Sequence, residues 1–157
     1  MSNDERIQRA VELFHQGFNC AQSVCAAFAD LYGYTEEQAL RMSAAFGGGI
    51  GRMRQTCGAA CGMFLLAGLD QGAVRGDDRE GKGRCYALVQ QMAEAFRQEN
   101  GALLCSELLG LKSQPQPPTP EARTSQYYAK RPCPQIVESA ARIVVQQLLE
   151  KETTAED

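Results

Sequence analysis

The stretch RQTCGAACGMFLLAGL, residues 54–69, decides the fold, because nearly all of its side chains are small or apolar. Cys57, Ala60, Cys61 and Phe64 recur within it at the spacing of one helix face. We therefore predict a helix from about residue 57 to residue 69. Its glycines and alanines would let other helices approach its backbone closely.

Helical spacing of apolar residues extends over most of the chain on both sides of this stretch. Ser2 with Glu5 and Thr35 with Gln38 match capping boxes, and Asn19 suits a helix N-cap. We expect further helices at 2–17, 19–33, 35–46, 83–100 (starting as early as 78), 106–109 and from 134 onward.

No segment shows the period-two alternation of a β-strand. The fold class is therefore predicted as all-α, one bundle of about five to six helices with a Gly-rich loop and a Pro-rich loop. We expect one helical domain over residues 1–149 and a frayed acidic tail at 150–157.

Composition excludes several classes of partner. The 157 residues carry a formal net charge of −3 and no basic stripe, which argues against a nucleic-acid partner. The longest strongly apolar run, 63–69, is too short to span a membrane.

The N-terminal residues lack the features of a secretion signal, so we expect a cytoplasmic protein. Apolar helix faces are consistent with a homodimer, and no redox partner protein can be named.

Seven cysteines stand out in a protein expected to meet a reducing cytosol, where disulfide frameworks are uncommon. Four of them fall at or beside predicted helix starts, where unpaired N–H groups favour a thiolate. Four thiolates are the ligand set of a zinc site or an iron–sulfur cluster. The four are Cys20, Cys57, Cys105 and Cys133.

The other three cysteines lie inside predicted helices. Cys25 and Cys85 sit on apolar stripes, and we interpret both as small core residues. Cys61 follows Cys57 by one helical turn and shares its face. Cys61 could serve as a resolving thiol, as an extra ligand or as a small residue at a helix crossing, and the sequence leaves all three open.

The glycine cluster before Cys57 allows two interpretations. Glycines such as Gly49, Gly51 and Gly58 could place bare N–H groups around the Cys57 sulfur and so tune a cofactor or thiolate. They could equally permit a close approach of backbones. The cluster lacks the Lys-Ser/Thr of a phosphate-binding loop.

Four motifs in order carry a family resemblance: NCAQSV at 19–24, GGGIGRMRQTCGAACG at 47–62, LCSELLG at 104–110 and PC at 132–133. Over about residues 7–149 the chain resembles the C_GCAxxG_C_C family of redox-active proteins. The resemblance implies a redox role and a bound group such as an iron–sulfur cluster. It also implies that the four defining cysteines are Cys20, Cys57, Cys105 and Cys133, and it leaves Cys61 without a role.

Three functions follow as hypotheses. In the first, the four motif cysteines converge on one centre that binds an iron–sulfur cluster, or zinc, for electron transfer or redox sensing. In the second, the protein is a thiol–disulfide enzyme or sensor with Cys57 as nucleophile and Cys20, Cys61 or Cys105 as resolving thiol. In the third, it is a non-catalytic helical interaction module with buried cysteines.

Overall fold

The computed structural model describes residues 1–150, and within them the protein is all-α, as predicted. No β-strand occurs in this part of the chain, where Thr56 and Leu104 form an isolated bridge. The α-helices are α1 (Asn3–His15), α2 (Cys20–Ala26), α3 (Glu36–Ser43), α4 (Gly47–Ile50), α5 (Gly58–Gln71), α6 (Arg79–Asn100), α7 (Cys105–Leu109), α8 (Ser125–Lys130) and α9 (Cys133–Val144). Short 3₁₀ turns at Ala29–Tyr32 and Ala44–Phe46 and a π-helical turn at Val145–Leu149 complete the chain.

The helices outnumber the five or six expected because the structure adds short segments. Residues 47–50 were expected to be loop but form the turn α4, and the residues after the Pro-rich loop form α8. Thr124 caps α8 by accepting a hydrogen bond from the Tyr127 N–H. The expected acidic tail at 150–157 lies, apart from Glu150, outside the described residues.

Local capping sets the helix starts, as the sequence predicted. Ser2 with Glu5 and Thr35 with Gln38 form complete capping boxes. The Asn19 side chain accepts a hydrogen bond from the Gln22 N–H, and the Gln22 side chain accepts one from the Asn19 N–H. These bonds satisfy backbone groups that a helix leaves unpaired at its first turn.

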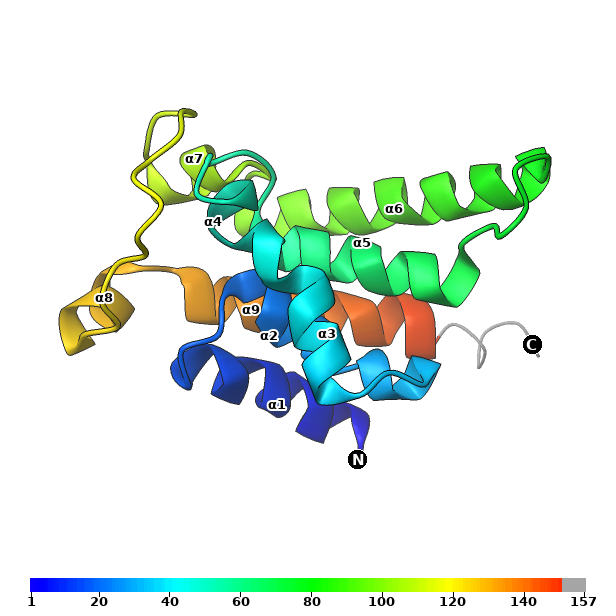
Figure 1. Cartoon of the computed structure of the whole chain (residues 1–157), viewed down its shortest axis with the longest axis horizontal. Coiled ribbons are helices and arrows are strands. Elements are labelled where there is room, and N and C mark those ends of the chain that lie inside the picture. Colours follow the sequence, from blue (N-terminus) through cyan, green and yellow to red (C-terminus); the bar gives the residue numbers. More distant parts are fainter. Residues whose placement is uncertain (151–157) are drawn as a thin grey trace.

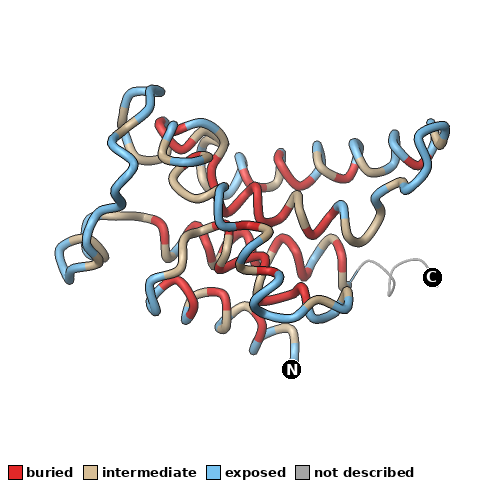
Figure 2. The backbone as a smooth tube through the Cα atoms, in the orientation of Figure 1, coloured by how far each residue is buried: buried red, intermediate tan, exposed pale blue. Residues whose placement is uncertain are grey.

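Helix α5 is the centre of the bundle, with α2 and α9 on one side and α6 along the other (Figure 1). The buried residues follow this centre in Figure 2, while the outer face of α6 is exposed. A Cβ atom on Gly62 would lie 2.9 Å from Val24 Cβ and 3.0 Å from the Ala21 carbonyl oxygen. Only a glycine therefore lets α2 and α5 cross this closely.

The segment before α5 is a left-handed turn. Five consecutive residues, 48–52, have positive φ angles, and two of them, Ile50 (φ 67°) and Arg52 (φ 63°), are not glycine. Left-handed backbone normally occurs at single residues and strains a side chain-bearing residue by about 1–3 kcal/mol. Hydrogen bonds from Arg54 N to Gly48 O (3.2 Å) and from Gln55 N to Gly49 O (2.8 Å) hold the turn.

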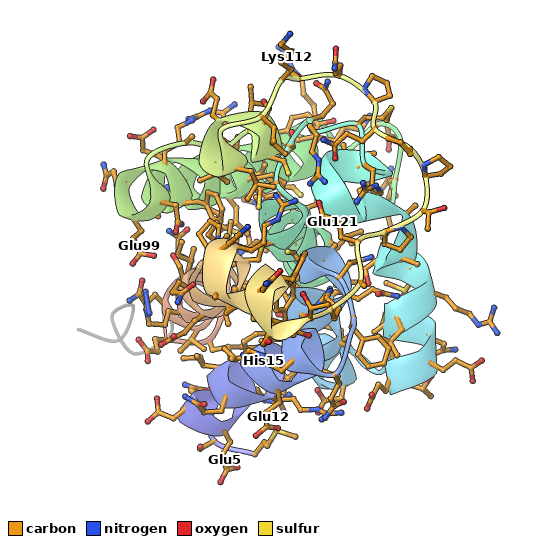
Figure 3. The ribbon with its side chains drawn as sticks, turned by 90° about the vertical axis from the view of Figure 1, so that its left-hand side faces the viewer. Glu5, Glu12, His15, Glu99, Lys112 and Glu121 are labelled. Carbon is orange, nitrogen blue, oxygen red and sulfur yellow. The ribbon has the colours of Figure 1, made fainter. Side chains whose placement is uncertain are left out.

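One end of the bundle is built from this turn, α7, α8 and the Pro-rich loop. In Figure 1 these elements lie together on the left, away from the C-terminus. Figure 3 looks onto this end, where the loop from Lys112 to Glu121 arches beside the turn. Gln116 N donates to Arg52 O (3.0 Å), and Arg52 Nε donates to Pro117 O (2.7 Å). None of the described helices has the length and apolar character needed to cross a membrane.

Candidate functional site

The four cysteines at predicted helix starts line one cavity of about 560 Å³ at this end of the bundle. Cys20, Cys105 and Cys133 are the first residues of α2, α7 and α9, and Cys57 is the N-cap of α5. Four segments that are distant in sequence therefore bring their first turns to the same place. Cys57, Cys105 and Cys133 are buried and Cys20 is half-buried.

Backbone hydrogen bonds fix two of these cysteines relative to each other. Cys57 N donates to Leu103 O (2.9 Å), and Cys105 N donates to Gln55 O (2.7 Å). These two bonds tie the start of α5 to the start of α7. The Asn19 side chain donates to Ala44 O (3.0 Å) and so anchors the start of α2 beside the same segment.

Cys20 and Cys133 are an electrostatically linked pair at the wall of this cavity. The interaction with Cys20 lowers the pKa of Cys133 to about 7, and the charges of Arg131, Arg123 and Arg54 act in the same direction, while burial opposes them. The interaction with Cys133 raises the pKa of Cys20, and burial raises it further. Cys133 is therefore the more acidic member of the pair.

Cys57 differs from the expectation that a helix start favours its thiolate. Burial raises the pKa of Cys57 to about 12, and the N–H groups of Ala59 and Ala60 at the start of α5 lower it only in part. The expectation is wrong here and at Cys20, because burial or the neighbouring sulfur outweighs the helix terminus. At Cys133 the pKa is lowered, but by the Cys20 side chain and the nearby arginines rather than by the helix start.

Cys61 lies outside the set of described residues that line the cavity. Its sulfur lies 3.9 Å from the Thr56 carbonyl oxygen, and burial raises its pKa to about 11. Cys25, fully buried, packs in a small separate cluster with Ala29 and Ala39, as expected of a core residue. Cys85 is half-buried on α6.

Gly49, Gly51 and Gly58 all line the cavity. A Cβ atom on Gly49 would lie 2.6 Å from Cys105 Cβ, and one on Gly58 would lie 2.9 Å from the Phe46 carbonyl oxygen. The N–H of Gly51 is bonded to Ala45 O (2.9 Å). At Gly49 and Gly58 the observed role is therefore the close approach of neighbouring atoms to the glycine backbone.

The sequence interpretation did not place two residues, Arg123 and Tyr127, in the site, and it took Tyr127 for a packing residue. The Arg123 guanidinium lies 4.2 Å from the centre of the Phe14 ring and donates to Phe14 O (2.7 Å) and Phe18 O (2.9 Å). Tyr127 lines the cavity, and burial followed by the charge of Cys133 raises its pKa to about 12. Both come from the segment after the Pro-rich loop, where no helical periodicity gave a signal.

A metal site requires a tighter arrangement than this one. Within residues 1–150, no three side chains of histidine, cysteine, aspartate or glutamate stand close enough together to hold a metal ion. Four cysteine sulfurs have the right chemistry for zinc or an iron–sulfur cluster. Their arrangement does not form the ligand set that either requires, so no step of the chemistry is derived from such a group.

We expect Cys133 to be the cavity cysteine that iodoacetamide alkylates fastest near neutral pH, since only the thiolate reacts. Because its pKa is lowered to about 7, its alkylation rate should rise through pH 7 and level off above about pH 8. Cys57, with a pKa of about 12, should stay unmodified over this range. Peptide mass spectrometry after timed alkylation measures both rates. If the alkylation rate of Cys133 reached half its maximum only at about pH 8.5, which is the ordinary pKa of a cysteine, the lowered pKa of Cys133 would be contradicted.

Comparison with known proteins gives one match. The model of the family described as "Putative redox-active protein (C_GCAxxG_C_C)" matches residues 18–147. Searches of curated proteins and of solved structures gave no significant match.

Proposed function

The chain belongs to the C_GCAxxG_C_C family of redox-active proteins, and from that premise we propose that it works by thiol–disulfide exchange, with Cys133 as nucleophile and Cys20 as resolving thiol. The observation that carries the proposal is that Cys20 and Cys133 line one cavity together with Arg54, Arg123 and Arg131, whose charges lower the pKa of Cys133. Two cysteines in one cavity can act as nucleophile and resolving thiol, and the arginines favour Cys133 as the reactive thiolate.

The chemistry balances as a two-electron transfer. The Cys133 thiolate attacks one sulfur of a substrate disulfide, forms a mixed disulfide and releases the other half as a thiolate. Cys20 then loses its proton and attacks the Cys133 sulfur, which releases the second half as a thiolate. The protein ends with a Cys20–Cys133 disulfide, and the substrate ends as two thiols after taking up two protons.

The proposal differs from a mechanism in which Cys57 is the nucleophile. The raised pKa of Cys57 leaves almost no thiolate at neutral pH. Cys57 and Cys105 also line the cavity. A reducing compartment such as the cytoplasm suits a protein in which all seven cysteines are free thiols.

A second candidate is a cluster or zinc site that uses all four cysteines. The lining of a single cavity by these four side chains favours it. The absence of a three-ligand group among the described residues opposes it, because ligation would require the cysteines to move together. We therefore assign the cluster no part in the mechanism above.

One experiment separates the two candidates. Protein purified without oxygen is examined for iron, sulfide, zinc and visible absorption, then reduced and titrated with a small disulfide before peptide mapping. We expect a colourless, metal-free protein that forms one disulfide, between Cys20 and Cys133, and releases two thiols. Stoichiometric iron and sulfide that the four cysteines retain would instead establish the cluster, and a disulfide that includes Cys57 would overturn the assigned pair.

A further inference from the structure

Arginine dominates the charge around the cysteine cavity. The described residues that line the cavity include four arginines and one glutamate and no other charged side chain: Arg52, Arg54, Arg123, Arg131 and Glu121. Arg131 forms an ion pair with Glu121. Within residues 1–150, no carboxylate pairs with any of the other three arginines. The cavity therefore holds an excess of positive charge.

Arg54 is the most informative of these residues, because it is only 4% exposed. Its guanidinium donates to the amide oxygen of Gln116 (2.6 and 2.9 Å) and to the Cys105 sulfur (3.4 Å). Neither of these two groups cancels a buried positive charge, and the single negative charge of a Cys133 thiolate is shared among Arg54, Arg123 and Arg131. Buried charges in proteins are ordinarily paired, so this guanidinium is poised for an anion inside the cavity.

Arg52 and Arg123, both half-buried, add further positive charge to the lining of the cavity. Arg52 is held by Pro117 O (2.7 Å), and Arg123 by two backbone carbonyls and the Phe14 ring. These contacts fix each guanidinium without neutralising it. Fixed, uncompensated cations in a low-dielectric cavity raise the local concentration of anions.

The size and depth of the cavity limit what can reach the sulfurs. A volume of about 560 Å³ is in the range of small-molecule sites. Cys57, Cys105 and Cys133 are each between 5 and 8% exposed, so the disulfide of a folded protein could not approach them. A small, flexible molecule could.

We propose that the electron acceptor of this cavity is a low-molecular-weight disulfide that carries carboxylates, bound through Arg52, Arg54 and Arg123. The proposal rests on the thiol–disulfide function proposed above and names its substrate class. The carboxylates pair with the guanidinium groups, which places the disulfide bond against Cys133. The exchange then follows the two steps already given, and the products are two carboxylate-bearing thiols and the oxidised protein.

Three disulfides of similar length and different charge test this substrate class: dithiodipropionate, hydroxyethyl disulfide and cystamine. Fully reduced protein is mixed with each, and formation of the Cys20–Cys133 disulfide is followed in a single turnover. Each rate is divided by the rate at which dithiothreitol in solution reduces the same disulfide. This normalisation removes differences in the intrinsic reactivity of the three disulfides. We expect the normalised rate of the dianion to exceed that of the dication by at least about tenfold at low salt, and the ratio to shrink as salt rises.

Two cavity variants and one matched control assign this preference to residues. Arg123→Gln and Arg52→Gln should each reduce the dianion-to-dication ratio severalfold. Arg75→Gln removes the same charge from an exposed residue that is paired with Asp77 outside the cavity and should leave the ratio unchanged. The ratio is the readout because it compares substrates within one variant, so a general change in Cys133 reactivity cancels. Equal ratios in all four proteins would overturn the proposal.

Binding without chemistry separates this proposal from the thiol–disulfide function. Suberate replaces the disulfide of dithiodipropionate by two methylene groups and cannot react. Calorimetry should show that suberate binds the Cys20→Ser/Cys133→Ser protein and that Arg123→Gln weakens this binding. If suberate binds but no Cys20–Cys133 disulfide ever forms, the thiol–disulfide function fails while the anion site stands. If the disulfide forms at rates indifferent to substrate charge and suberate does not bind, the substrate class is wrong and the function stands.

Discussion

Gly49→Ala is expected to lower the free energy of unfolding by about 4 kcal/mol, the largest stability loss we predict for a single added methyl group. Gly49 has a φ angle of +69°, which a residue with a Cβ atom adopts only under strain. The added Cβ would also lie 2.7 Å from Arg54 Cα and 2.7 Å from Gln55 N. Both contacts are with backbone, which cannot move aside as the end of a side chain can.

Gly110→Ala is the matched control for this prediction. Gly110 has nearly the same φ angle, +67°, but no atom within 4 Å of the position of a Cβ. The free energy of unfolding of Gly110→Ala should therefore fall only by the cost of a positive φ angle in alanine, about 1 kcal/mol. Urea unfolding of both variants measures the difference. Equal losses would show that the left-handed turn relaxes around the new methyl group, and that the cavity wall at Cys105 is less rigid than the geometry implies.

Cys133→Ser is expected to abolish formation of the disulfide and to slow the first exchange step by at least about a hundredfold. Serine cannot form the sulfur–sulfur bond, and burial still raises the pKa of the remaining partner, Cys20, after the Cys133 sulfur is gone. The release of thiol from a small disulfide, followed by absorbance, measures the loss.

Cys85→Ser is the control for this variant, since Cys85 is half-buried on α6 and does not line the cavity. It should exchange at the rate of the parent protein. A protein in which Cys57→Ser rather than Cys133→Ser removes the first step would reverse the roles of the two cysteines. The far-ultraviolet circular dichroism of each variant should match the parent, so that a loss of exchange is not a loss of fold.

The sequence predicted those parts of the fold that depend on neighbouring residues. The capping boxes at Ser2 and Thr35 and the N-cap at Asn19 formed as expected, because each is completed within a single helical turn. Helix α8 was missed, because it follows a Pro-rich segment and has no buried face that would give a periodic signal. The handedness of residues 48–52 was also missed, since a run of glycines indicates backbone freedom without its direction.

The site divides in the same way. Residue spacing alone identified four cysteines at helix starts. The sequence also showed the basic residues that precede Cys133. Only the tertiary structure showed that Cys133 and Cys20 line one cavity, that Cys57 is buried, and that Arg123 lines the same cavity. Helix starts are set by hydrogen bonds among adjacent residues, whereas the pKa of a thiol is set by burial and by charges brought near through space. That is why the sequence by itself determined which cysteines stand at helix starts, and the fold determined their burial and the charges around them.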